Sequence, residues 1–466
     1  MTTPDPLTSP ATAAGPASNV IDDAPLTAFH RKLTMFCSGG PFLDGFALGV
    51  IGFALPQIAD QWQLSGTWQG FLAVAPLLGV PAVIGVGYLT DLLGRRIMYV
   101  ADIAAITLLC VAQFFVTGPV QLLVLRVLLG IAIGADYPIA SSLLAEFAPR
   151  KARAKLIGLQ TIMWTAGNAA AYLVGAALLQ LGTEAWRWIL LSPAVIGALL
   201  AILRIGTPES PRWLISKGRT DEALGVVQKV YGPHATLDGI GEESTPTSLR
   251  LIFRSPYLKR TIFVGTFWAC SITPVYAIYA FAPKLLEAFD LSGQGAVDIG
   301  SVLVGLFFLV GTIFATVVSD RLPRRTLLIW PFMIASAALL ALGAFADATA
   351  IVVVVLFAVY AMAIGGPTIL QWIYPNEIFP TEIRATAFSI GLSISRVGTI
   401  LGTFAVPLLL DHTGVSGTMI VVGVISAVGA VCSLVMAPET HGRPLTESAA
   451  PRPRHDTTEP GPLKQL

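Results

Sequence analysis

The stretch Gly87-Tyr88-Leu89-Thr90-Asp91-Leu92-Leu93-Gly94-Arg95-Arg96 decides the fold, because a similar polar stretch returns as Val317-Val318-Ser319-Asp320-Arg321-Leu322-Pro323-Arg324-Arg325. Each stretch interrupts apolar sequence and carries an aspartate followed by a pair of arginines. Asp91 and Asp320 are 229 positions apart, and so are Arg95 and Arg324. Equal separations indicate equivalent positions in two copies of one unit.

Two further polar signals repeat at nearly the same distance. Three residues recur 231 positions later, since Glu146, Pro149 and Arg153 return as Glu377, Pro380 and Arg384. The pair Pro208-Glu209 returns 230 positions later as Pro438-Glu439. A chance likeness between basic loops would not preserve order, spacing and residue type together. The sequence therefore predicts an internally duplicated chain.

The composition is that of a membrane protein. Hydrophobic residues make up 54% of the chain and charged residues 12%, whereas a soluble domain carries roughly 25% charged residues. The net charge of +1 and the lack of a concentrated basic arm argue against nucleic-acid binding. The sequence shows no phosphate-binding glycine loop, metal cluster or nucleophile motif. We therefore expect no enzymatic activity, no cofactor and no metal.

Apolar stretches of about 20 residues, long enough to cross a bilayer as helices, fill most of the chain. We place them near 33–58, 68–90, 97–117, 120–145, 154–182, 187–206, 260–287, 297–319, 326–346, 349–375, 385–411 and 415–437. Residues 1–32 and 438–466 are polar and rich in proline, and we interpret them as disordered cytosolic tails. Residues 207–259 are interpreted as a cytosolic linker with short amphipathic helices that start near Ser210-Pro211 and Thr220.

Lysine and arginine predict the orientation of the spans. With the N-terminus in the cytosol, 24 of the 29 lysines and arginines fall in cytosolic tails and loops. Such an excess predicts that both termini are cytosolic. We expect a multi-pass protein of the plasma membrane that works as a monomer in the lipid bilayer.

The repeated pieces resemble those of the major facilitator superfamily, and within it the sugar-porter-like metabolite:proton symporters. The resemblance covers roughly residues 33–445 and implies an all-α integral membrane fold. It implies 12 transmembrane helices in two pseudo-symmetric six-helix bundles, 33–206 and 260–437. The charged loops would form a cytosolic latch, a bistable ion-pair network that holds the outward-facing state. The expected latch residues are Asp91, Arg95, Arg96, Glu146, Arg153, Asp320, Arg324, Arg325, Glu377 and Arg384.

Four charged residues lie deep inside predicted spans: Asp44, Arg126, Asp136 and Arg396. A charge near the bilayer centre costs at least about 2.5–3.5 kcal/mol, so each is a candidate functional residue. The alternative for each is a structural ion pair or a helix-end residue that reaches the headgroups. For Asp102, near the start of its span, this structural interpretation is the better one.

The resemblance suggests roles for Asp44, Arg126 and Asp136 in proton coupling. Arg126 matches an arginine that pairs with a proton-coupling aspartate of the first helix, but that aspartate aligns with Ala47 here. Asp44 lies three residues earlier on nearly the same helix face and is a candidate to serve Arg126. Either Asp44 or Asp136 would carry the proton.

Tyr137, Trp268 and Tyr276 match site residues of phosphate:proton symporters, although the aspartate expected between the last two is Ile272. This departure argues against inorganic phosphate, and the absence of paired glutamines in helix seven argues against hexose. Such aromatic residues also serve as packing or interface residues. Arg396 offers a planar fork that fits a carboxylate with two hydrogen bonds.

The sequence therefore predicts a secondary transporter that moves a small organic anion, such as a carboxylate or aromatic acid, together with protons. Arg396, Tyr137, Trp268 and Tyr276 would bind the substrate. The alternatives are transport of a sugar, polyol or phosphate, efflux of hydrophobic compounds, and a sensor of the same fold that does not transport.

Overall fold

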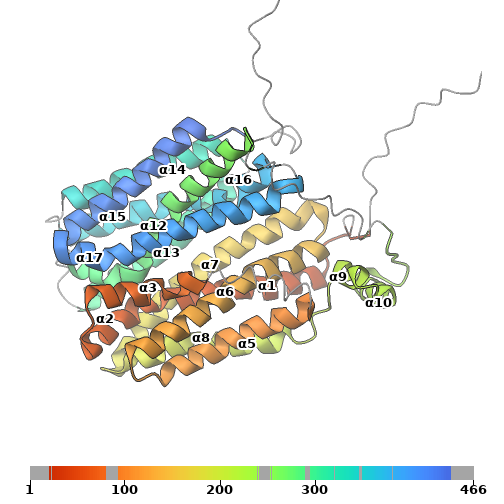
Figure 1. Ribbon diagram of the computed structural model, residues 1–466, viewed down its shortest axis with the longest axis horizontal. Coiled ribbons are helices and arrows are strands. Elements are labelled where there is room, and N and C mark those ends of the chain that lie inside the picture. The colour runs from red at the N-terminus through yellow and green to blue at the C-terminus, as the bar shows by residue number, and fades with distance from the viewer. Residues whose placement is uncertain are drawn as a thin grey trace, which may run out of the picture.

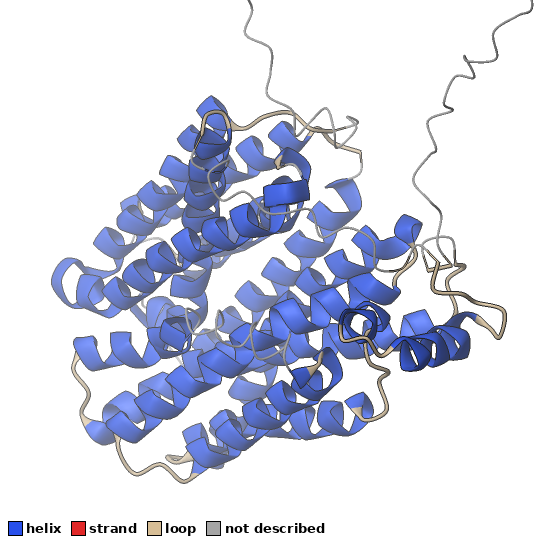
Figure 2. Cartoon of the chain, turned by 45° about the vertical axis from the view of Figure 1, so that its right-hand side comes forward, coloured by secondary structure: helices blue, strands red, loops and turns tan. Residues whose placement is uncertain are grey.

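The computed structural model describes residues 20–21, 24–79, 93–238, 240, 252, 254–288, 294–319, 321–345, 349–379 and 381–441. Regular structure in these ranges is helical, and no strand occurs there (Figure 2). The helices before the linker are α1 (Ala28–Gly49), α2 (Ile51–Trp62), α3 (Gly66–Gly79), α5 (Arg95–Phe114), α6 (Pro119–Phe147), α7 (Arg150–Leu178) and α8 (Ala185–Arg204). Those after it are α12 (Tyr257–Ala288), α13 (Gln294–Ser319), α14 (Arg324–Ala344), α15 (Ala350–Ala363), α16 (Gly365–Ile378) and α17 (Thr381–Met436).

The linker contains α9 (Pro211–Ser216) and α10 (Thr220–Tyr231), which confirms the two predicted helix starts. Proline stands at the first position of α9, and the Ser210 hydroxyl caps that helix by accepting from the Trp213 backbone N–H. α1 begins at Ala28, about one helical turn before the predicted end of the N-terminal tail at residue 32. Further upstream, Ile21 is buried in an apolar cluster with Val227 of α10 and its neighbours.

Ten helical segments within the described ranges are long and apolar enough to cross a membrane. The last, Ile390–Met436, has 47 residues, and α17 breaks inside it at Gly414, where φ is 68°. Since about 20 residues suffice for one crossing, this segment is long enough for two. The predicted span 68–90 is described only as far as Gly79, the end of α3. The twelve-span count stays a prediction with which these segments agree.

The helices form two groups that run side by side along the length of the molecule, α1–α8 and α12–α17 (Figure 1). In the first group α1 packs on α7 and α5 on α8, and in the second α12 and α14 both pack on α17. Contacts between the groups join α7 to α13 and α3 to α17. These two contacts are equivalent under exchange of the halves, as the duplicated sequence predicts.

Small residues allow the closest helix approaches. A Cβ atom on Gly130 of α6 would overlap the backbone of Pro76 in α3, and one on Gly79 would meet the backbone of α6 in return. Lipid supplies little hydrophobic drive for helix association, so close backbone packing of this kind stabilises the bundle.

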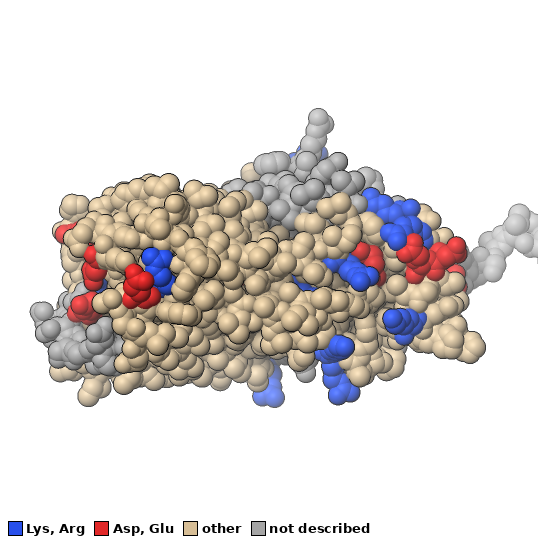
Figure 3. Space-filling model, turned by 90° about the horizontal axis from the view of Figure 1, so that it is seen from below, with Lys and Arg blue, Asp and Glu red and all other residues tan. Residues whose placement is uncertain are grey.

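We call the end of the molecule that carries α9 and α10 the linker end, and the other end the far end (Figure 1). On the face in Figure 3, charged side chains gather mainly toward the two ends, and most densely near the linker end. Large apolar side chains such as Leu108 of α5 and Val195 of α8, each in the middle of its helix, are exposed. A belt of this kind is suited to contact with lipid.

The orientation of the linker end is a testable prediction. Because most lysines and arginines belong to this end, reporter fusions after Gly241 and after the last residue, Leu466, should both report cytosol. A reporter placed in the short turn at Thr183, between α7 and α8 at the far end, should give the opposite signal. A periplasmic signal at either of the first two positions would contradict the predicted topology.

Candidate functional site

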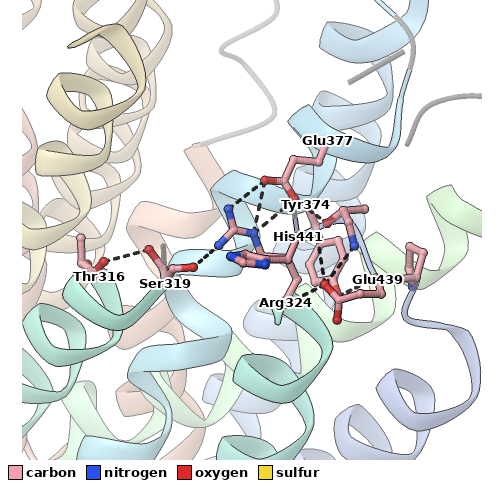
Figure 4. Close-up of polar contacts among 9 residues, drawn as sticks. Thr316, Ser319, Arg324, Tyr374, Glu377, Glu439 and His441 are labelled. Atoms are coloured by element: carbon pink, nitrogen blue, oxygen red, sulfur yellow. Dashed lines mark hydrogen bonds and ion pairs between the residues drawn. The ribbon is translucent and has the colours of Figure 1, made fainter. Parts of the chain in front are cut away.

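Each half carries a charged cluster at the linker end, and the cluster of the second half is drawn in Figure 4. The Arg324 guanidinium lies 3.0 Å from Glu377 Oε1, and the Thr440 hydroxyl donates to the other Glu377 oxygen at 2.5 Å. Glu439 accepts from the backbone N–H of Arg324 at 2.9 Å and from that of Arg325 at 3.1 Å. Glu439 thus holds the N-terminus of α14, where the helix dipole favours an anion.

The first half repeats this arrangement residue for residue. Arg95 pairs with Glu146, and the Ser210 hydroxyl donates to Glu146. Glu209 accepts from the backbone N–H of Arg95 at 3.0 Å and from that of Arg96 at 3.1 Å. Glu209 and Ser210 therefore have the places that Glu439 and Thr440 have in the second half. The sequence showed the repeat of Glu209 and Glu439 but not that they cap helices.

The described charged pairs among the predicted latch residues lie within one half each, and the latch itself stays a prediction. Arg95 joins α5 to α6, and Arg324 joins α14 to α16. Asp91, Asp320 and the side chains of Arg153 and Arg384 lie outside the described residues. Among the residues that are described, the charged clusters brace each half internally.

Glu439 provides a pH-dependent test of this bracing. Burial raises the pKa of Glu439, but backbone N–H groups of His441, Arg325, Arg324 and Thr440 outweigh it and hold the pKa below its ordinary value of 4.5. A depressed folded-state pKa means that the stabilisation is complete above pH 4.5 and is lost as pH falls through the lower folded value.

Glu439→Gln should therefore lower the free energy of unfolding of the purified protein at pH 7 by about 1 kcal/mol, which is measured as a lower thermal midpoint. In acid the difference from the wild type should shrink. Glu287→Gln, at an exposed acid near the end of α12, is the matched control and should change nothing. Equal midpoints for wild type and Glu439→Gln at pH 7 would show that the cap does not brace the half.

Inside the first half, Arg204 at the end of α8 forms a second, fully buried cluster. Its Nη1 lies 2.8 Å from Asp136 Oδ1 and 3.3 Å from Asp102 Oδ1, and it donates to the Tyr99 carbonyl at 2.8 Å. The guanidinium also lies 3.7 Å from the centroid of the Tyr99 ring. Asp136 therefore belongs to an ion-pair network of α5, α6 and α8. Arg204 is a participant that sequence reasoning missed, although a charge within an apolar span was the available signal.

Asp44 of α1 faces this cluster and not Arg126. Its side chain is fully buried, and neither carboxylate oxygen has a hydrogen-bond partner within the described part of the chain. Its electrostatic neighbours are Asp136, Asp102 and Arg204. The candidate pairing of Asp44 with Arg126 is wrong for this structure.

Arg126 lies apart, in the packing between α6 and α3. It is 1% exposed, and its Nε donates to the Leu72 carbonyl at 3.1 Å. Its two Nη atoms have no hydrogen-bond partner among the described residues. Ala47 in place of the family's first-helix aspartate is consistent with this uncompensated guanidinium.

Arg396 lies where the two halves meet. Its guanidinium is 5.7 Å from the centroid of the Tyr276 ring, and its Nε is buried without a hydrogen-bond partner among the described residues. Tyr276 of α12 lies within electrostatic range of both Arg396 and Asp44. The Trp164 ring of α7 is 5.9 Å from the Tyr276 ring. Tyr276 therefore has Asp44 of the first half and Arg396 of the second half as electrostatic neighbours.

Trp268 and Tyr137 were predicted as further site residues. Trp268 is 2% exposed and packs against Phe388 at 5.1 Å and Trp372 at 6.0 Å between ring centroids. It is thus part of an aromatic group inside the second half, two helical turns before Tyr276. The Tyr137 side chain lies outside the described residues.

Contacts between the halves close the far end. The Tyr172 hydroxyl donates to the Tyr279 carbonyl at 2.9 Å, and Lys284 Nζ donates to Gln69 Oε1 at 3.1 Å. Phe71 and Phe404 pack with ring centroids 5.0 Å apart. A cavity lined by Tyr276, Asn168, Thr403 and their neighbours has room for about one water molecule. Access to the centre from the far end is closed in this conformation.

Comparison with known proteins agrees with this architecture. A family model described as sugar (and other) transporter matches residues 32–450. The chain is 40% identical over 433 residues to the putative metabolite transport protein YaaU of Escherichia coli K12, covering 93% of this chain and 97% of that protein. It is 29% identical over 395 residues to the gallate transporter of Pseudomonas putida, covering 82% of this chain and 86% of that protein.

Solved structures of the Escherichia coli xylose transporter XylE share the fold. The partially occluded inward-open form has a TM-score of 0.76 at 21% identity, covering 90% of this chain and 100% of that chain. XylE bound to 6-bromo-6-deoxy-D-glucose has a TM-score of 0.70 at 22% identity, covering 90% and 98%. The resemblance of the sequence to the major facilitator superfamily is confirmed.

Proposed function

Because this chain belongs to the sugar (and other) transporter family of the major facilitator superfamily, we propose that it moves a small organic anion together with protons across the plasma membrane. Its relatives are transport proteins, and the chain is not an enzyme. The two halves would alternate access to a central site near Tyr276, with the linker end in the cytosol. The working unit would be a monomer.

The observation that carries the anion assignment is Arg396. A guanidinium at the junction of the halves has no ion-pair partner among the described residues, since Asp136 pairs with Arg204 instead. A partly buried cation without a counter-charge is costly, and an anionic substrate would supply that charge when it binds. Tyr276 and Trp164 beside it offer the aromatic walls that a ring-bearing acid needs.

The gallate transporter among the relatives carries an aromatic carboxylate, which supports this substrate class. A neutral sugar is the second candidate, because the glucose transporter GlcP of Staphylococcus epidermidis is 30% identical to this chain over 439 residues. A sugar has no charge to offer Arg396, which favours the anion. The alternatives of phosphate, polyol or hydrophobic efflux substrates have no specific observation in their favour.

Thermal denaturation of the purified protein against a ligand panel tests the assignment. A ligand that binds only the folded state adds about 2.7 kcal/mol at a hundred times its dissociation constant. Aromatic and aliphatic carboxylates should raise the midpoint, whereas neutral sugars and phosphate should not. Stabilisation by neutral sugars alone would overturn the organic-anion proposal.

A further inference from the structure

Four buried charged side chains converge in the first half from four different helices. Asp44 comes from α1, Asp102 from α5, Asp136 from α6 and Arg204 from α8, and all are 5% exposed or less. We call these four residues the acidic cluster. The position of α1 against it is fixed by Gly40, where any Cβ would overlap Asp136 and Arg204. Asp44 follows Gly40 by one helical turn and therefore faces the same way.

Charge balance within the acidic cluster is the decisive feature. Three carboxyl groups share one guanidinium, so full ionisation would give a net charge of −2 away from water. Arg204 Nη1 already serves Asp136 and Asp102 together, at 2.8 Å and 3.3 Å. Both carboxyl groups therefore lie beside the same Arg204 nitrogen, and Oδ2 of each has no hydrogen-bond partner among the described residues. Two carboxylates that share one cation in a dry site repel each other, so one of them holds a proton.

Asp44 is the second proton carrier by an independent observation. Both of its oxygens lack any hydrogen-bond partner in the described part of the chain. An ionised carboxylate without donors in a dry interior is strongly disfavoured, and the group takes up a proton instead. The neighbouring Asn168 amide donates to the Gly45 carbonyl and not to Asp44.

The other groups around Asp44 supply no compensating charge. The Tyr99 hydroxyl donates to Cys37 Sγ at 3.3 Å, and both side chains face the cluster from α5 and α1. Tyr276 faces Asp44 from α12. A thiol and two phenols carry no charge near neutral pH. α7 contributes Trp164 and Asn168 at this place, and neither titrates.

We propose that the acidic cluster is a two-proton site, with one proton on Asp44 and one shared by Asp102 and Asp136. Arg204 holds the carboxyl groups of Asp102 and Asp136 in place. That the proton of Asp44 is the one coupled to transport rests on the proposed function. When the halves move and water reaches the cluster, each carboxyl group can release its proton to water and become a hydrated carboxylate. Arg204 is a positioning residue, because it fixes how many of the three carboxyl groups stay neutral.

Infrared spectroscopy of the substrate-free protein in lipid vesicles at neutral pH tests the proposal. The carbonyl stretching band of protonated carboxyl groups should be present in the wild type. Asp44→Asn, Asp102→Asn and Asp136→Asn should each remove about half of it. Arg204→Gln should raise the band by about half, because the third carboxyl group then loses its counter-charge. Asp60→Asn, at an exposed acid of α2, is the control and should leave the band unchanged.

Three outcomes would overturn the proposal. The first is the absence of the band in the wild type, and the second is its persistence at full strength in Asp44→Asn. The third is a band that appears in choline chloride and disappears in sodium chloride, which would make the site a sodium site. If Arg204→Gln fails to fold, the three asparagine variants still decide. Because no substrate is added, a negative result here leaves the anion assignment standing, and a failed ligand panel leaves this result standing.

Discussion

Arg396→Lys is expected to weaken carboxylate binding roughly ten- to hundredfold, a loss of about 1.4–2.8 kcal/mol. Lysine keeps the positive charge but loses the planar fork that donates two parallel hydrogen bonds. In the structure the Arg396 guanidinium lies beside Tyr276 and has no carboxylate partner among the described residues. The change should therefore affect the ligand more than the fold.

The measurement is a ligand titration of purified wild type and Arg396→Lys, followed by intrinsic tryptophan fluorescence. Arg212→Lys, at an exposed arginine of α9, controls for the general effect of the exchange and should bind like the wild type. The thermal midpoint without ligand should be nearly equal in all three proteins. If Arg396→Lys binds as tightly as the wild type, Arg396 does not contact the substrate.

Asp44→Asn is expected to abolish accumulation of substrate against its gradient while exchange across vesicles continues. The amide cannot gain or lose a proton, so the variant stays in the neutral state that the wild type has in this closed conformation. Uptake should then stop at equal concentrations inside and outside, whatever the proton gradient. The binding constant for the substrate should change little, because the charged neighbours of Asp44 are Asp136, Asp102 and Arg204 and not Arg396.

Parallel assays in vesicles of concentrative uptake and of exchange between equal compartments check this expectation. Asp60→Asn is again the control and should behave as the wild type in both. Accumulation that survives in Asp44→Asn would assign coupling to the pair of Asp102 and Asp136.

The architecture was predictable from sequence because its causes are local and repeated. Apolar length gives a span, and the duplicated charged stretches give two equivalent halves. The linker helices were readable from Ser210-Pro211 and Thr220, which are local signals for a helix start. The burial of Ile21 beside α10 was not predictable, because it depends on a contact between segments about 200 residues apart.

The candidate site was predictable as a set of residues but not as a set of pairs. A buried charge in an apolar span is visible in sequence, and all four such residues are buried or partly buried in the structure. Which charges meet depends on how the helices rotate and pack. Asp136 meets Arg204 of α8, and Arg126 donates to the carbonyl of Leu72. The latch residues likewise pair within each half, which spacing along the chain does not reveal.

The most direct test of proton-coupled anion transport uses vesicles that contain the purified protein and a pH-sensitive dye, with no initial pH gradient. Addition of gallate outside should acidify the interior. Each gallate anion would enter together with at least one proton, and that proton is released inside because the carboxylate stays ionised at neutral pH. The acidification should saturate with gallate, should be absent from empty vesicles, and should be lost in Asp44→Asn. Acidification by a neutral sugar but by no carboxylate in a panel of aromatic and aliphatic acids would contradict the account.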